Sequence, residues 1–164
     1  MRNKVKAGDV FLIPLEKTTS AGGMVISAWK HELYIVVFEE KFANDQINIP
    51  KILSGKPMFL TLTLDAKLWN GDWPIVGNEL EQTKSFPQPS FKVQSNGTEY
   101  IESLDRKVCR VASDAESQIL RYRKISSPAI IDEATKGKFG IVEWNSYYDA
   151  LLAHYAIESS KLLR

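Results

Sequence analysis

The side chains that could carry catalytic chemistry are few and far apart in this sequence. Nucleophilic catalysis pairs a Ser, Cys or Thr with an oriented base, usually a histidine, and the two histidines here are His31 and His154. One falls in an expected hairpin turn and the other in an expected C-terminal helix, so solvated side chains are the better reading. The one cysteine, Cys109, lies beside cations that would favour a reactive thiolate, but its strand pattern favours a small packed side chain.

Motifs for phosphate, dinucleotide or zinc binding do not occur. The sequence contains no GxxxxGK[ST], GxGxxG, HExxH or paired CxxC. Asp65 and Asp72 are close enough in sequence to act as a general acid and base, yet Asp65 is already explained as the cap of a helical turn. We therefore expect no catalytic site, no bound metal and no cofactor. A hydrolase that uses carboxylates with His31 or His154 is kept as an alternative.

Acidic and aromatic side chains are the candidates for binding another protein. The segments 39–46 and 78–89 are polar and are expected to be exposed loops, and acidic rims of this kind can meet a basic partner. Buried aromatic anchors carry much of the affinity of such contacts. The predicted partner-binding residues are Glu39, Glu40, Glu79, Glu81, Trp29 and Trp144.

A basic cluster gives a second class of function. Cations interleaved with an aromatic residue are typical of nucleic-acid binding proteins, and here Tyr122 lies among them. The alternative explanation for these cations is a solvated helix end, because positive charges are favoured at helix C-termini. The cluster consists of Arg106, Lys107, Arg110, Arg121, Arg123 and Lys124.

The composition is that of an ordinary soluble globular protein. Hydrophobic residues make up 44% and charged residues 25% of the 164 residues, and the formal net charge is +1. A single cysteine excludes an intrachain disulfide framework and favours a reducing compartment. The first nine residues lack an apolar segment, and the longest apolar run, residues 33–38, is too short to cross a bilayer. We expect a cytoplasmic protein that does not associate with membranes.

The elements that must position these side chains centre on residues 57–77. Up to Leu64, aliphatic side chains alternate with an aromatic residue and two threonines, which predicts an antiparallel strand with its aliphatic face on a core. Asp65 is expected to cap one helical turn. Trp73-Pro74 then forces an extended conformation.

Further strands are expected over residues 10–15, 24–29, 33–38, 91–94, 98–103 and 107–112, and helices over 114–122, 128–135 and 146–162. Pro14 predicts that the first strand lies at an edge or stops there, and residues 16–23 are expected to form a loop. The strands over 24–29 and 33–38 are expected to form a hairpin, and Asn96-Gly97 predicts a hairpin turn between the strands over 91–94 and 98–103. Pro128 is expected in the first turn of its helix. Ser146 and Asp149 predict a capping box at the start of the last helix. Strands followed by helices indicate an α+β fold in one domain, residues 1–164. We expect a bent, mostly antiparallel sheet, or a partly open barrel, covered by C-terminal helices.

Two ordered motifs in the first hundred residues resemble one known family. The run Gly8-Asp9-Val10-Phe11-Leu12-Ile13-Pro14-Leu15 is similar to the opening strand of the immunity protein 26 family. The run Trp73-Pro74-Ile75-Val76-Gly77, followed by residues 89–92, resembles the W-P-x-x-G signature of the same family. The motif residues are Gly8, Asp9, Phe11, Pro14, Trp73, Pro74 and Gly77, and the likeness is strongest over residues 8–93.

This resemblance implies an immunity protein of a bacterial polymorphic toxin system. Such a protein is a cytoplasmic, non-enzymatic binder, and its partner is the cognate toxin domain that it holds inactive. Nucleic-acid binding through the 106–124 basic cluster is the alternative function.

Overall fold

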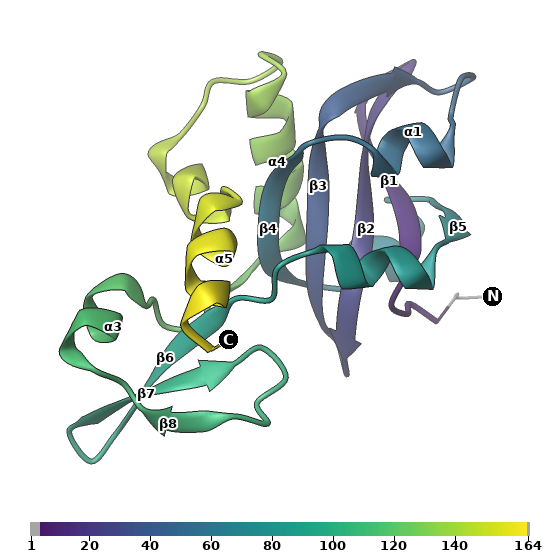
Figure 1. Cartoon of the computed structure of the whole chain (residues 1–164). Helices are drawn as coiled ribbons and strands as arrows, with labels where there is room; N and C mark the ends of the chain where they lie inside the picture. Colours follow the sequence, from purple (N-terminus) through teal and green to yellow (C-terminus); the bar gives the residue numbers. More distant parts are fainter. Residues whose placement is uncertain (1–3, 164) are drawn as a thin grey trace. The chain divides into compact units, whose positions relative to one another are not determined.

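The computed structural model describes residues 4–163, and its strands form two sheets (Figure 1). A six-stranded sheet has the order β5-β1-β2-β3-β4-β9, and a three-stranded sheet has the order β6-β7-β8. Neighbouring strands are antiparallel except for the parallel pair β4 and β9. The strands are β1 Asp9–Glu16, β2 Thr19–Trp29, β3 Glu32–Ala43, β4 Pro57–Leu64, β5 Ile75–Asn78, β6 Ser90–Ser95, β7 Thr98–Ser103, β8 Cys109–Val111 and β9 Ile125–Ser126.

Short helices complete an α+β fold, which confirms the expected fold class. The six-stranded sheet does not close into a barrel, and a second sheet was not expected. The helices are α1 Ile49–Leu53, α2 Ala66–Trp69, α3 Asp114–Ile119, α4 Pro128–Lys138 and α5 His154–Ser159, with 3-10 helices η1 Leu80–Ser85, η2 Ser146–Leu151 and η3 Ser160–Leu163.

The chain folds into two compact units. The larger unit contains the residues up to Phe86 together with Ile125–Ala153, and the smaller unit contains Pro87–Lys124 and the residues from His154 onward. The six-stranded sheet with α4 therefore belongs to the larger unit, and the three-stranded sheet with α5 belongs to the smaller one. A single domain that spans both units stays a prediction.

The hairpin of β2 and β3 is confirmed, but it begins earlier than expected. Residues 16–23 were expected to form a loop, and this is wrong, because β2 starts at Thr19 and pairs with the end of β3. Gly22 and Gly23 lie inside the strand, where they allow close packing. A Cβ atom on Gly22 would lie 2.4 Å from Cγ2 of Ile52, and one on Gly23 would lie 2.5 Å from Cζ of Phe11.

The first strand is an inner strand along part of its length only. β5 pairs with β1 from Asp9 to Phe11, so the prediction of an edge strand is wrong for that half. Pro14 lies beyond these pairs, and on its other side it is opposite Ser20 of β2. Because β5 does not reach Pro14, no hydrogen bond between β1 and β5 is lost at the proline, which has no N–H to donate. The strand β1 can therefore continue through Pro14 to Glu16.

Strand β4 is buried on both faces, although only its aliphatic face was expected to be. The side chains of Phe59 and Thr63 lie on the opposite face of β4 from that of Leu62, and both are fully buried. The hydroxyl of Thr63 donates to the carbonyl oxygen of Ser126 at 2.8 Å. A hydroxyl can be buried here because it is hydrogen-bonded to the neighbouring strand β9.

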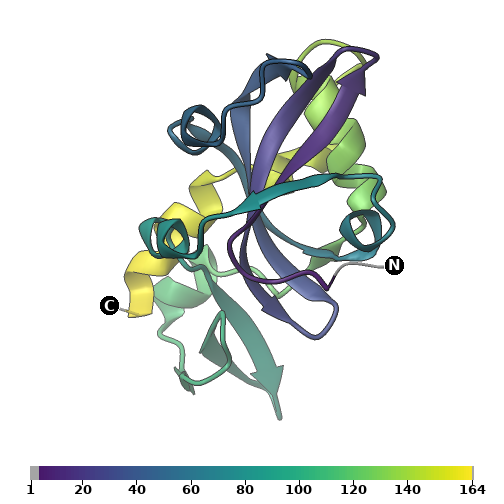
Figure 2. The same cartoon turned by 90° about the vertical axis from the view of Figure 1, so that its right-hand side faces the viewer.

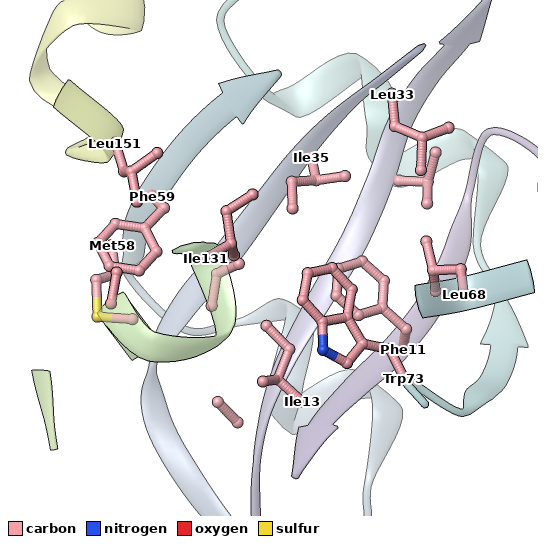
Figure 3. Close-up of a cluster of buried hydrophobic side chains, with 14 of the residues drawn as sticks. Phe11, Ile13, Leu33, Ile35, Met58, Phe59, Leu68, Trp73, Ile131 and Leu151 are labelled. Carbon is pink, nitrogen blue, oxygen red and sulfur yellow. The ribbon is translucent and has the colours of Figure 1, made fainter. Parts of the chain in front are cut away.

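The core of the larger unit lies between the six-stranded sheet and α4 (Figure 3). Trp73 is 1% exposed and stacks on Phe11 with ring centroids 5.4 Å apart and an angle of 6° between the planes. Its indole N–H donates to Oδ1 of Asp132 in α4 at 3.1 Å. Trp73 is therefore packed inside the unit, whereas the neighbouring Pro74 is exposed. Other side chains of the same buried cluster are Ile13, Leu33, Ile35, Met58, Phe59, Leu68, Ile131 and Leu151.

The C-terminal helix expected over residues 146–162 is interrupted. Leu152 is extended and forms a bridge with Phe59 of β4, which separates η2 from α5. The expected capping box at Ser146 is also wrong, because Asn145 caps η2 and the carboxylate of Asp149 accepts from the indole of Trp144 at 3.0 Å. Contacts with β4 therefore decide the local conformation of this segment.

Two turn predictions have different outcomes. The Asn96-Gly97 hairpin is confirmed, with φ angles of 49° and 79° at the turn between β6 and β7. Asp65 precedes α2 as expected, but its side chain makes no capping hydrogen bond. One of its carboxylate oxygens lies 3.2 Å from Nδ1 of His31 instead.

We predict that Leu62→Ala lowers the free energy of unfolding by about 2–5 kcal/mol, because Leu62 is 3% exposed between Tyr34 of β3 and Ile125 of β9. Urea unfolding measures this loss. Leu64→Ala on the same face is the matched control, and since Leu64 is 42% exposed its loss should stay near about 1 kcal/mol. A loss below roughly 0.5 kcal/mol for Leu62→Ala would contradict the burial of this strand.

Candidate partner-binding site

The two sequence motifs lie side by side on β1 and β5. Asp9 is opposite Asn78 and Val10 is opposite Gly77. The carboxylate of Asp9 is 3% exposed, and it accepts from the backbone N–H of Lys6 at 2.9 Å and from the Asn78 amide at 3.0 Å. A buried carboxylate that is satisfied in this way fixes the backbone on both strands.

Gly8 lets the segment after β5 pass close to the start of β1. Its φ angle is +90°, and a Cβ atom would lie 2.8 Å from the backbone of Leu80. The carbonyl oxygen of Gly8 accepts from the N–H of Glu79 at 2.9 Å. The first motif thus holds the backbone of Glu79 in place, although Glu79 is not part of either motif.

Helix α1 packs against β5, the strand that carries the end of the second motif. Asn48 caps it by accepting from the N–H of Lys51 at 3.1 Å, and Pro50 occupies its first turn, where the missing N–H costs nothing. A Cβ atom on Gly77 would lie 2.5 Å from Cδ1 of Ile49. The glycine of the second motif therefore allows Ile49 to rest directly on β5.

These contacts leave a hollow between α1 and η1 (Figure 2 shows the two helices on one side of the sheet). Its volume is about 290 Å³. Its lining combines an apolar wall from α1 with one carboxylate and two neutral polar side chains: Ile49, Pro50, Leu53, Ser54, Glu79 and Gln82. A hollow of about 260 Å³ in the smaller unit is lined by prolines, serines and leucines, with Gln88, and none of the described residues that line it is charged.

The four acidic residues predicted as partner contacts are all exposed. Glu39 and Glu40 lie within β3, so the loop expected over residues 39–46 is wrong for its first half. Glu79 lines the hollow described above, whereas the carboxylate of Glu81 is 3.0 Å from the ammonium group of Lys84. Glu79 and Glu81 both lie at the start of η1, but their carboxylates have different surroundings.

The two predicted aromatic contacts differ in exposure. Trp29 at the end of β2 is 53% exposed, and the ammonium group of Lys30 lies 4.7 Å from its ring centroid. Trp144 packs against Tyr148 and Phe59, with ring centroids 5.1 and 6.4 Å away. Trp29 therefore offers a partner more surface, and both contacts stay predictions.

The structure brings together two of the candidate catalytic residues in the larger unit. Nδ1 of His31, whose side chain is 79% exposed, lies 3.2 Å from a carboxylate oxygen of Asp65, whereas Asp72 is exposed nearby in sequence and His154 is exposed on α5. Cys109 is exposed in β8, so the expected packed cysteine is wrong. Within residues 4–163 there is no group of three or more His, Cys, Asp or Glu side chains that could hold a metal ion.

Much of the basic cluster is used to hold the smaller unit together. Arg110 donates to both carboxylate oxygens of Glu116 at 2.9 and 2.7 Å, and this hydrogen-bonded pair lowers the pKa of Glu116 to about 2. Arg123 donates to Glu102 at 2.8 Å. The guanidinium of Arg121 lies 4.7 Å from the ring centroid of Tyr155. Two of these cations are paired with carboxylates and the third is stacked on an aromatic ring. They would therefore attract nucleic-acid phosphates less strongly than unpaired cations would.

Comparison with known families decides what kind of protein this is. The family model described as Immunity protein 26 matches residues 6–101, more than half of the chain. The chain belongs to the immunity protein 26 family. The matched residues include both motifs, α1 and the whole lining of the hollow beside Glu79.

The other comparisons add no relative to this family assignment. Neither the curated proteins nor the solved structures gave a match. Among residues 4–163, no helix has both the length and the apolar character that a membrane span requires.

We predict that Gly8→Ala destabilises this immunity protein 26 member more than Gly71→Ala does. Both glycines have positive φ angles, but nothing lies within 4 Å of a Cβ atom on Gly71, whereas one on Gly8 meets the backbone of Leu80. Gly71→Ala should therefore carry only the left-handed backbone cost of about 1–2 kcal/mol. Equal losses in chemical unfolding would contradict the close approach of Leu80 to Gly8.

Proposed function

We propose that this protein is a cytoplasmic immunity protein that binds a cognate polymorphic toxin and blocks its active site. The observation that carries the proposal is the family match over residues 6–101. Members of an immunity protein family are expected to neutralise a toxin, and the partner is then a toxin domain. The protein acts as a stoichiometric inhibitor and performs no catalysis.

A rigid folded surface supports inhibition by occlusion. Binding that needs no reorganisation avoids the entropic cost of ordering the interface. The Phe11–Trp73 stack and the buried Asp9 carboxylate fix β1 and β5 from inside the larger unit. The exposed side chains on these elements are thus held in place before the toxin arrives.

The exposed acidic residues supply the expected steering charge. Glu39, Glu40, Glu79 and Glu81 would attract a toxin with a basic active-site rim, and Trp29 or Trp144 would anchor the contact. Nucleic-acid binding is the weaker candidate, because Arg110, Arg121 and Arg123 are held by groups of their own unit.

The direct test uses the toxin domain encoded beside this chain. A pull-down should recover a complex of the two proteins, and the toxin's activity should fall linearly until one equivalent of the immunity protein has been added. Failure of the two purified proteins to associate would refute the proposal. Complete inhibition at a small fraction of one equivalent would refute the stoichiometric mechanism.

We predict that the double variant Glu79→Lys, Glu81→Lys associates with that toxin domain on the order of tenfold more slowly at low salt and with a weaker salt dependence. Both carboxylates are exposed at the start of η1, where a rim charge acts on the encounter. Stopped-flow or surface-based kinetics measure the rate constant. Glu143→Lys with Glu158→Lys gives the same change in net charge at other exposed positions, and an equal effect in both variants would rule out steering by this segment.

A further inference from the structure

We infer that the hollow between α1 and η1 receives one basic side chain of the toxin, a lysine or an arginine. The inference rests on the proposed function and names the contact that anchors it. Three features of the hollow support this occupant: its walls, its charge and its size.

The walls suit the carbon chain of a long basic residue. Ile49 and Leu53 of α1 are partly buried and form, with Pro50, an apolar surface beside the carboxylate. Lysine and arginine bury their methylene groups along such surfaces while the charged group reaches a polar partner. A purely acidic surface would provide the charge but no contact for the carbon chain.

The carboxylate of Glu79 has no cationic partner in the part of the chain that the structure describes. No ion pair of Glu79 exists within residues 4–163, whereas Glu81 is paired with Lys84 at 3.0 Å. Lys51 of α1 places its ammonium group 5.8 Å from the ring centroid of Phe42. A carboxylate beside apolar atoms interacts more strongly with a cation than one surrounded by water.

The backbone around Glu79 is held before binding. Its N–H donates to the Gly8 carbonyl oxygen at 2.9 Å, and the amide of neighbouring Asn78 donates to Asp9 and to the carbonyl oxygen of Ala7, each at 3.0 Å. On the opposite wall, Gly77 provides the space for Ile49. The two family motifs thus build both sides of the hollow, which gives them a role in binding as well as in packing.

The size fits one side chain better than a drug-sized ligand or a cofactor. Pockets for drug-sized molecules and cofactors measure about 300–1,000 Å³ and enclose most of the ligand. This hollow, at about 290 Å³ and open to solvent, is suited to one side chain of a protein partner. A well-packed anchor of this kind is typical of the few residues that dominate an interface.

The test compares two neutralising variants against the toxin domain encoded beside this chain. Glu79→Gln should raise the Kd about tenfold or more, mainly through faster dissociation, because it leaves the toxin's cation without its partner. Glu143→Gln makes the same change in net charge at an exposed position outside the predicted partner contacts. It should change the Kd by less than about threefold.

A second variant tests the hollow without changing charge. Gln82→Trp places a large side chain at an exposed lining position and should weaken binding about as much as Glu79→Gln, with an unchanged melting temperature. If wild-type protein binds the toxin and both Glu79→Gln and Gln82→Trp bind within twofold of it, the inference is wrong while the proposed function stands. If the wild-type protein does not bind the toxin, the proposed function itself fails.

A small probe tests the pocket independently of the toxin. In an NMR titration of the full chain, Nα-acetyl-arginine amide should shift the amide signals of Leu53, Glu79 and Gln82 with a millimolar Kd. The neutral isostere Nα-acetyl-citrulline amide should not, and Glu79→Gln should abolish the response to arginine. Equal responses to the two compounds, or no response to either, would overturn the assignment of a cationic occupant.

Discussion

The stack of Phe11 on Trp73 is the contact on which the larger unit depends. It joins the middle of β1 to the corner before β5, and the indole N–H extends the connection to Asp132 of α4. Three segments far apart in the sequence are thereby fixed by one fully buried aromatic pair. Because both rings lie inside the core, the aromatic residues of the family motifs would contribute to the proposed partner-binding surface only through the elements that they position.

Close packing at glycine extends this constraint outward. With no Cβ atom at Gly22 or Gly77, α1 packs directly against β2 and β5 through Ile52 and Ile49. At Gly8 the chain also uses a left-handed backbone conformation, which brings the start of η1 against β1. A tightly packed interior therefore ends in a defined hollow on the surface, with the carboxylate of Glu79 at its rim.

This arrangement suits the proposed role of a protein inhibitor, which needs a rigid surface of exposed side chains. In the larger unit such side chains include Glu39, Glu40, Glu79 and Glu81. In the smaller unit, the contacts of Arg110 with Glu116 and of Arg123 with Glu102 stabilise the local fold.

The sequence by itself determined the family, the α+β class and the elements that local chemistry specifies. Among these are the Asn96-Gly97 turn, the hairpin of β2 and β3, and the proline in the first turn of α4. Each depends on residues close together in the chain, so the periodicity of apolar side chains and the conformational preferences of glycine and proline were enough.

Only the tertiary structure decided what depends on distant partners. Gly22 was assigned to a loop because the sequence does not distinguish a glycine needed for a turn from one needed for close packing. The structure shows that Gly22 is needed for close packing, against the side chain of Ile52. Leu152 leaves the helical pattern because β4 offers it a bridge at Phe59. The hollow beside Glu79 was likewise beyond prediction, since its two walls come from segments about thirty residues apart whose approach is set by packing and not by local preference.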